Sequence, residues 1–125
     1  MEERKTILIV DDSNAMRAFI ISGLGELSDF EFKEARTGFE ALKELPRSNY
    51  ALIISDINMP DINGLELLNF IKTSEQYRKI PVLMISTETK EEDLQRALSM
   101  GADDYLTKPF DLQTLKKKVK KLLGR

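Results

Sequence analysis

The sequence contains no cysteine, no histidine and no tryptophan. Without cysteine the chain can form neither a disulfide nor a thiolate zinc site. Without histidine it can form no catalytic triad, no imidazole metal site and no histidine general base. Any chemistry must therefore depend on carboxylates, hydroxyls, lysine and arginine.

The chain also lacks a long apolar run and a large excess of one charge. Its longest apolar run, Tyr50–Ile54, is far shorter than the roughly 20 residues that span a bilayer. The net charge is −2, so we expect neither a nucleic-acid partner nor a membrane surface. The charged start, Met1–Lys5, leads into an apolar block too short for a signal peptide, and we expect a cytoplasmic protein. Residues 111–125 hold six cations and one acid, and their lysines are expected to form a solvated helix face.

A chain of 125 residues with 42% apolar residues has the size and composition of one domain. We therefore expect a single domain over residues 1–125, with no room for a second module such as a DNA-binding domain. We also expect a monomer.

The strands are expected where apolar residues cluster without polar alternation. Ile7–Val10, Ala51–Ile54 and Val82–Ile85 are such blocks, and they are typical of strands buried on both faces inside a parallel sheet. Phe30–Glu34 alternates and predicts an edge strand, and Asp104–Thr107 fits a fifth strand.

Helical patterns lie between these strands. A short segment, Phe39–Leu45, is expected to stop at Pro46. The other four patterns are apolar stripes at helical spacing: Met16, Phe19, Ile20, Leu24 and Leu27; Leu67, Leu68, Phe70 and Ile71; Leu94, Ala97 and Leu98; Leu112, Leu115, Val119 and Leu122. Five strands alternating with five helices predict an α/β protein with a doubly wound parallel sheet.

Polar residues follow four of the five predicted strands. Asp11 and Asp12 follow the first strand, Asp56 the third, Ser86 the fourth and Lys108 the fifth. In an open α/β sheet the carboxyl ends of the strands meet at one edge, and ligands bind there. We therefore expect three carboxylates, a hydroxyl and an ammonium group to converge.

Three neighbouring acids demand a cation. Two charges about 4 Å apart repel by roughly 4 kcal/mol at an effective dielectric constant near 20, and one lysine offsets only part of this. Carboxylates without histidine or cysteine favour Mg²⁺ or Mn²⁺. A metal, a lysine and a hydroxyl around a carboxylate suit phosphoryl transfer, and the carboxylate can itself become an aspartyl phosphate.

These residues occur in segments that resemble the receiver domain of two-component response regulators: Ile9–Ser13, Ile54–Pro60 with Gly64, Met84–Ser86 and Lys108–Phe110. Asp56–Pro60 and Gly64–Leu68 look like the stand-alone, CheY-like chemotaxis type in particular. The resemblance covers essentially the whole chain. It implies a flavodoxin-like sheet with the strand order 2-1-3-4-5, which is the known order in CheY.

The resemblance also implies a function. A sensor histidine kinase would phosphorylate Asp56 with Mg²⁺, and the domain would then bind a downstream protein, such as a flagellar motor switch or phosphorelay protein. Mn²⁺ can substitute. Asp12 and Asp56 would hold the metal directly, together with the main-chain carbonyl of Asn58, while Asp11 acts through water. The domain would be no enzyme beyond catalysing its own phosphorylation and dephosphorylation.

Further roles are implied for the remaining motif residues. Ser86 and Lys108 would hold phosphoryl oxygens, and the Lys108–Pro109 peptide bond would be cis. Ser86 and Tyr105 would form the switch, although Tyr105 can equally be an ordinary strand aromatic. Asn58 and Glu88 would tune the lifetime of the phosphate.

Three other interpretations need weighing. A haloacid-dehalogenase-type phosphatase also uses a nucleophilic aspartate, Mg²⁺ and a lysine, but it needs a second aspartate where this chain has Asn58. A flavodoxin-like FMN carrier needs a phosphate loop after the first strand, where Asp11 and Asp12 would repel the phosphate. The acid pair can also serve merely as a helix cap.

Overall fold

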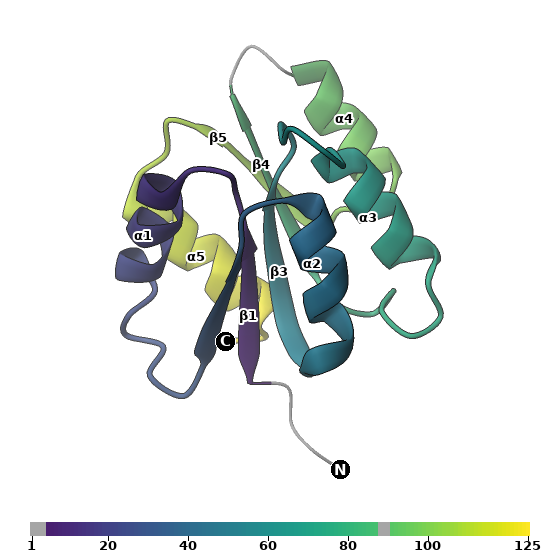
Figure 1. Cartoon of the computed structure of the whole chain (residues 1–125). Helices are drawn as coiled ribbons and strands as arrows, with labels where there is room; N and C mark the ends of the chain where they lie inside the picture. Colours follow the sequence, from purple (N-terminus) through teal and green to yellow (C-terminus); the bar gives the residue numbers. More distant parts are fainter. Residues whose placement is uncertain (1–4, 88–90) are drawn as a thin grey trace.

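A computed structural model describes residues 5–87 and 91–125 of the chain. Its centre is one parallel sheet with the order β2-β1-β3-β4-β5, which confirms the predicted class and strand order (Figure 1). The strands are β1 (Thr6–Val10), β2 (Glu31–Ala35), β3 (Tyr50–Asp56), β4 (Val82–Thr87) and β5 (Asp104–Lys108).

Helices cover both faces of the sheet (Figure 1). Helices α1 (Asn14–Gly23) and α5 (Leu112–Leu122) pack on one face. Helices α2 (Gly38–Glu44), α3 (Gly64–Thr73) and α4 (Glu91–Ser99) pack on the other. The five predicted helices are therefore all present. None of the helices in the described ranges is both long and apolar enough to cross a membrane.

The two layers of helices explain why the central strands do not alternate. In β1, Ile7 and Ile9 face the core beneath α1 and α5, whereas Leu8 and Val10 face the core beneath α2, α3 and α4. All four are buried, and each contributes about 1.5–3 kcal/mol relative to an exposed side chain. Strand β2 pairs only with β1 and is mostly exposed, which confirms the predicted edge strand.

Two aromatic residues predicted to face inward do not do so. Phe19 is 39% exposed and packs on Phe110, and Phe70 is 45% exposed and packs on Tyr77. Each lies about 100° around its helix from the next residue, which is a buried isoleucine. The centre of the buried face of α1 instead runs through a charged residue, Arg17.

The end of α2 also differs slightly from the prediction. The α-helix ends at Glu44, and residues Leu45–Arg47 continue as a 3₁₀ turn that contains Pro46. Proline is tolerated there because the first positions of a helical turn need no backbone N–H partner.

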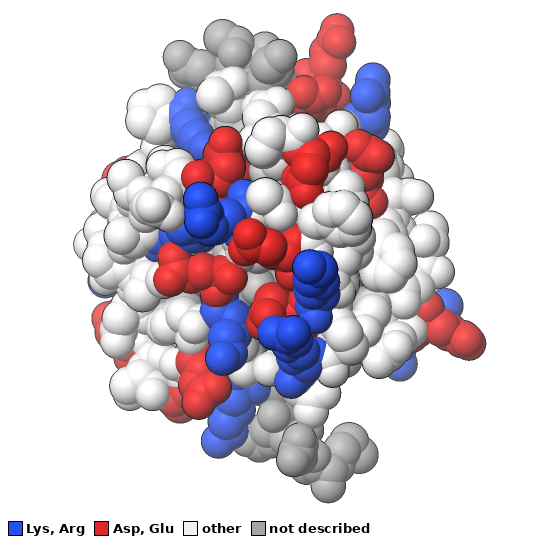
Figure 2. All heavy atoms as spheres, in the orientation of Figure 1, with Lys and Arg blue, Asp and Glu red and all other residues white. Residues whose placement is uncertain are grey.

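The surface carries both signs of charge. On the face shown in Figure 2, acidic and basic side chains are interspersed, without a broad field of one sign. This agrees with the small net charge of −2.

Candidate functional site

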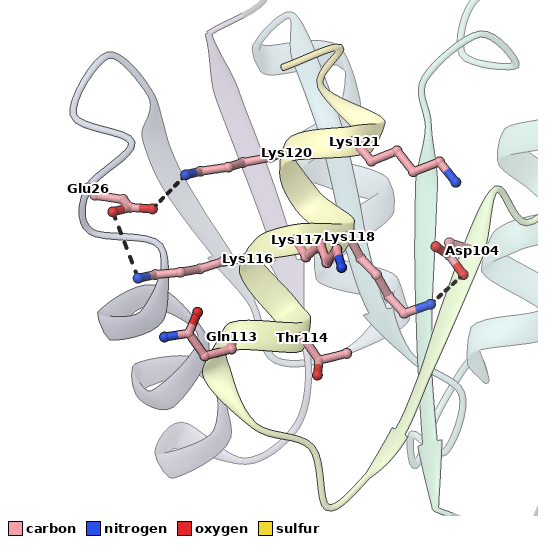
Figure 3. A pocket seen from close by; sticks show the side chains of 9 residues that line it. All are labelled: Glu26, Asp104, Gln113, Thr114, Lys116, Lys117, Lys118, Lys120 and Lys121. Carbon is pink, nitrogen blue, oxygen red and sulfur yellow. Dashed lines mark hydrogen bonds and ion pairs between the residues drawn. The ribbon is translucent and has the colours of Figure 1, made fainter.

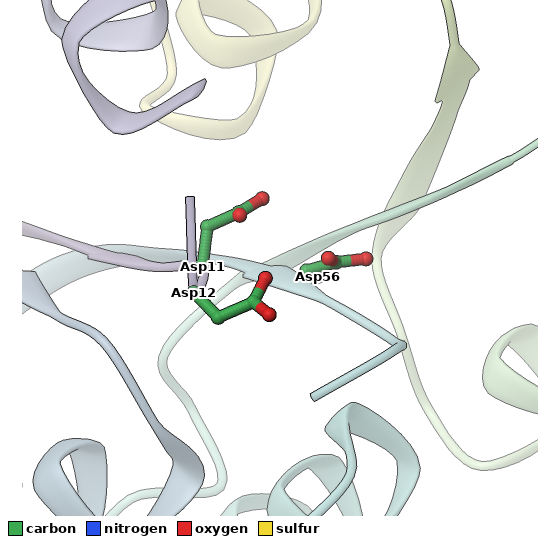
Figure 4. A group of neighbouring side chains, drawn as sticks. All are labelled: Asp11, Asp12 and Asp56. Atoms are coloured by element: carbon green, nitrogen blue, oxygen red, sulfur yellow. The ribbon is translucent and has the colours of Figure 1, made fainter. Parts of the chain in front are cut away.

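Three acids meet at the carboxyl edge of the sheet (Figure 4). Asp11 and Asp12 follow β1, and Asp56 is the last residue of the neighbouring strand β3. One carboxylate oxygen from each of the three lies within 4.8 Å of the others. Asp11 and Asp56 are buried, whereas Asp12 is exposed. The edge therefore presents a cluster of oxygen ligands that is open on the side of Asp12.

Lys108, the last residue of β5, reaches the same cluster from the other side of β4. Its Nζ lies 3.3 Å from Oδ2 of Asp56 and 3.4 Å from Oδ2 of Asp11. One lysine thus serves two buried carboxylates, and the four charged groups together carry a net charge of −2. A divalent cation would neutralise this remainder, and an all-carboxylate donor set fits Mg²⁺.

The electrostatics of Asp56 reflect this shortage of positive charge. Burial raises the pKa of its carboxyl group above the ordinary value, and the neighbouring charge of Asp11 raises it further. Lys108 and the backbone N–H of Asn58 lower the pKa, but they do not cancel the effect of burial. The negatively charged form of Asp56 is therefore unfavourable in this site, and a bound cation would stabilise it.

The backbone around Asp56 is fixed by the start of α3. The N–H of Gly64 donates to the carbonyl of Ile57 at 2.7 Å, and Asn63 and Glu66 form a reciprocal capping box. A Cβ on Gly64 would lie 2.2 Å from the carbonyl oxygen of Asp56. Only glycine permits this approach, so Gly64 contributes to the site by letting the start of α3 pack directly against the backbone of Asp56.

Ser86 completes the edge at the end of β4. It is buried, and its Oγ has no hydrogen-bond partner among the described residues. A buried hydroxyl left without a partner costs about 1–3 kcal/mol, so it is available to a ligand that brings an acceptor. The Lys108–Pro109 peptide bond beside it is cis, as the resemblance implies.

Comparison with known proteins identifies the family. The chain matches the model of the response regulator receiver domain over residues 7–120. It belongs to this family. The chemotaxis protein CheY-3 of Vibrio cholerae is 36% identical over 100% of this chain and 96% of its own length. CheY1 of Helicobacter pylori is 37% identical over 94% of this chain and 96% of its own. The structure of the chemotaxis response regulator CheY4 of Vibrio cholerae has a TM-score of 0.85 and 34% identity, and the match covers 96% of this chain and 99% of that one.

Membership has two direct consequences for this receiver domain. The domain takes part in phosphorylation signalling and is not an enzyme with an external substrate, which decides against the phosphatase interpretation. The triad of Asp11, Asp12 and Asp56 is the kind of acidic cluster that holds Mg²⁺ in receivers.

The structure describes one of the two residues that were predicted to tune the phosphate lifetime. Asn58 is exposed, and its backbone N–H donates to Oδ1 of Asp56 at 3.2 Å. Glu88 lies outside the described residues.

Tyr105 of the receiver domain shares a sheet face with Ser86. In the β4–β5 register Met84 pairs with Tyr105 and Ser86 with Thr107, so Tyr105 and Ser86 point to the side covered by α4. The ring is partly buried and borders a hollow of about 180 Å³ between α4 and β5.

The lysine run of the receiver lies along α5 (Figure 3). Lys116 and Lys120 pair with Glu26 at 3.8 and 3.0 Å, whereas Lys117 and Lys121 are exposed. Lys118 lies 2.9 Å from Asp104 and 5.6 Å from the centroid of the Tyr105 ring. Acidic neighbours therefore neutralise part of the lysine run, and one lysine contacts Tyr105. Only the remaining lysines form the solvated helix face that the sequence predicted.

Arg17 borders the site although no motif of the sequence points to it. Its guanidinium group is buried and donates to the main-chain carbonyl of Asp11. The available signal was its spacing, because Arg17 stands three and seven residues before the buried Ile20 and Leu24 and so occupies the apolar face of α1.

Proposed function

We propose that this receiver domain accepts a phosphoryl group on Asp56 from a sensor histidine kinase and passes the signal on by protein contact in chemotaxis. The observation that carries the proposal is the arrangement around Asp56. This buried carboxylate lies beside one ammonium group and two further acids, and the neighbouring strand β4 carries near its end a buried hydroxyl without a partner among the described residues.

The metal is Mg²⁺, for which Mn²⁺ can substitute. Asp12 and Asp56 would bind it directly with the main-chain carbonyl of Asn58, while Asp11 would act through water. When bound, the ion neutralises acid charge and the charge of the incoming phosphoryl group. The separation of the three carboxylates, within 4.8 Å, supports this assignment.

The transfer step uses Asp56 as the nucleophile. A carboxylate oxygen of Asp56 forms a bond to phosphorus while the nitrogen–phosphorus bond of the donor phosphohistidine breaks, and the electron pair leaves with the donor nitrogen. Lys108 and Ser86 then donate to oxygens of the transferred group. The lifetime of the resulting acyl phosphate would depend on Asn58 and Glu88, which can position water.

The signal leaves the site through Ser86 and Tyr105. A phosphoryl group adds acceptors that Ser86 satisfies by moving towards them, and this movement vacates space on the face that Tyr105 shares. The ring of Tyr105 turns inward, and Lys118 loses its place above the ring. The surface of α4, β5 and α5 therefore changes shape, and it is this surface that a downstream protein would bind.

Chemotaxis is the proposed context because the curated relatives described above are chemotaxis proteins. The downstream partner would be a flagellar motor switch protein or another phosphorelay protein, and the receiver would remain a monomer.

Incubation with acetyl phosphate and Mg²⁺ tests the phosphoacceptor. We expect one phosphate on Asp56, labile to base and hydroxylamine as an acyl phosphate is. Asp56→Asn should take up none, whereas Asp29→Asn, which alters an exposed acid paired with Arg125, should react like the wild type. Phosphate uptake by Asp56→Asn at the wild-type rate would show that the assignment is wrong.

A further inference from the structure

The guanidinium group of Arg17 is the most unusual charge in the described part of the molecule. Arg17 is only 5% exposed, although α1 lies at the surface. Its Nε donates to Oε1 of Glu34 at 2.8 Å, one Nη donates to Oδ1 of Asn14, and the other donates to the carbonyl oxygen of Asp11. One side chain thus connects α1, β2 and the end of β1.

Fold stability alone does not account for a charge in this position. Burying a guanidinium group is expensive even when it is paired, and a well-packed apolar residue of similar volume often stabilises a core as much or more. The neighbours of Arg17 on the same helix face, Ile20 and Leu24, are fully buried. A leucine would continue this face. What arginine supplies and leucine does not is donors for Glu34, for Asn14 and, at the site itself, for the carbonyl of Asp11.

With that contact, each polar atom of Asp11 has a partner. Its N–H donates to the carbonyl of Ala35 at 3.1 Å, its Oδ1 accepts from the N–H of Ser13 at 2.9 Å, and its Oδ2 faces Lys108 at 3.4 Å. The carbonyl oxygen is the remaining polar atom of Asp11, and Arg17 holds it.

The orientation of the Asp11 carbonyl also affects the position of the Asp12 backbone. The peptide bond is planar, so the carbonyl oxygen of Asp11 is coplanar with the nitrogen and Cα of Asp12. Asp12 itself is exposed. The orientation of this peptide plane therefore fixes the position of the Cα atom from which the Asp12 side chain leaves the backbone.

We propose that Arg17 is a positioning residue of the receiver site, which fixes the Asp11–Asp12 peptide unit so that the acid pair is preset for its cation. The inference rests on the metal-binding role proposed above. Arg17 does not contact the metal or the phosphoryl group, and it acts through the backbone of Asp11.

Titration calorimetry of the metal-free receiver with Mg²⁺ tests the inference. Groups that orient metal ligands typically change metal affinity by 10–100-fold when they are removed, so we expect Arg17→Met to raise the Kd by about tenfold or more. Arg17→Lys should recover part of the affinity, because lysine keeps the charge, but its single nitrogen cannot reach the three separate acceptors that the guanidinium group holds.

Lys72→Met is the matched control for general destabilisation. Lys72 is likewise largely buried, and its Nζ donates to the carbonyl of Ile80 at 2.8 Å and to Asp103 at 3.0 Å, at the opposite end of the sheet. This variant should lose stability and keep a wild-type Kd for Mg²⁺. A folded Arg17→Met protein that also keeps the wild-type Kd would overturn the inference.

Two milder variants cover the case in which Arg17→Met does not fold. Glu34→Ala and Asn14→Ala each remove one anchor of the guanidinium group and leave Arg17 in place, and we expect a loss of Mg²⁺ affinity of about twofold to tenfold. An unchanged Kd in both would overturn the inference. A wild-type protein that binds no Mg²⁺ would overturn the proposed metal role, whereas wild-type binding without an effect of these variants overturns only the role of Arg17.

Discussion

Asp56 carries its charge in an unfavourable place. Its pKa is raised above the ordinary value, first by burial and then by Asp11, against the opposing effect of Lys108. Between the ordinary pKa and the raised one, the folded protein binds more protons than the unfolded chain. The free energy of unfolding therefore decreases as the pH rises through this window. The ionised carboxylate of Asp56 therefore lowers the stability of the metal-free receiver.

Asp56→Asn should consequently stabilise the protein when a chelator removes metal. We expect a higher Tm near neutral pH, because a neutral amide replaces a buried charge. The gain should shrink as the pH falls towards the ordinary pKa of aspartic acid. Thermal unfolding at several pH values measures both effects. An equal or lower Tm for Asp56→Asn near neutral pH would contradict the cause given for the pKa.

Ser86 should behave unlike other buried hydroxyls. Its Oγ has no partner within the described residues, so Ser86→Ala breaks no hydrogen bond and should leave Tm unchanged or slightly raised. Ser55 is the control, because its Oγ donates to the carbonyl of Asp56 at 3.0 Å and Ser55→Ala should cost about 1 kcal/mol.

The phosphorylated state should reverse the result for Ser86. Ser86→Ala should still form the acyl phosphate with acetyl phosphate and Mg²⁺, but it should bind a phosphorylation-dependent partner poorly because a donor to the phosphoryl group is lost. Full partner affinity in this variant would exclude Ser86 from the switch.

At the scale of elements, the junction between β3 and α3 depends on Gly64. A Cβ there would overlap the backbone of Asp56 and Ile57, so Gly64→Ala must displace the helix start or the strand end. We expect a loss of at least about 2 kcal/mol in denaturant unfolding. In Gly25→Ala the nearest contact of the new Cβ is an ordinary 3.6 Å, so stability should change by less than about 1 kcal/mol. Equal stability of the two variants would contradict this account.

Strands β4 and β5 should transmit the phosphorylation state of the site to the surface beside Tyr105. The chain has no tryptophan, so Tyr105→Trp introduces a single tryptophan on the sheet face that it shares with Ser86, and its emission can be excited apart from that of the remaining tyrosines. Phosphorylation should change its emission, because the ring leaves the neighbourhood of Lys118 and becomes more buried. The same substitution combined with Asp56→Asn should show no response to acetyl phosphate. Emission that ignores phosphorylation would exclude the proposed movement of Tyr105.

For the whole molecule, stability and metal binding are linked. An ion that binds only the folded state adds about 2.7 kcal/mol to the free energy of unfolding at a hundredfold excess over its Kd. Millimolar Mg²⁺ should therefore raise Tm at low ionic strength, and Asp12→Ala should weaken the rise most. The same ionic strength supplied as a sodium salt is the control. A wild-type Tm that does not respond to Mg²⁺ would contradict the metal assignment.

Local pattern was enough to predict an α/β protein with a parallel sheet, whereas the strand order came from the resemblance to the family. Uninterrupted apolar blocks such as Ile7–Val10 occur where a strand has helices on both faces, and both faces of β1 are indeed buried. The meeting of Asp11, Asp56 and Lys108 also followed from local information, because each residue ends a parallel strand and such ends share one edge. The motif residues then supplied the family.

Other features were decided only when distant segments packed together. Periodicity records that a position of α1 faces inward, but it does not reveal that Arg17 finds Glu34 on β2 and the carbonyl of Asp11. Whether the Oγ of Ser86 finds a partner likewise depends on everything that surrounds it in the fold, and it finds none in the part of the chain that the structure describes. Hydrogen bonds between side chains require positions accurate to a fraction of an ångström, and residues 17 to 97 apart in the chain acquire such positions only through tertiary packing.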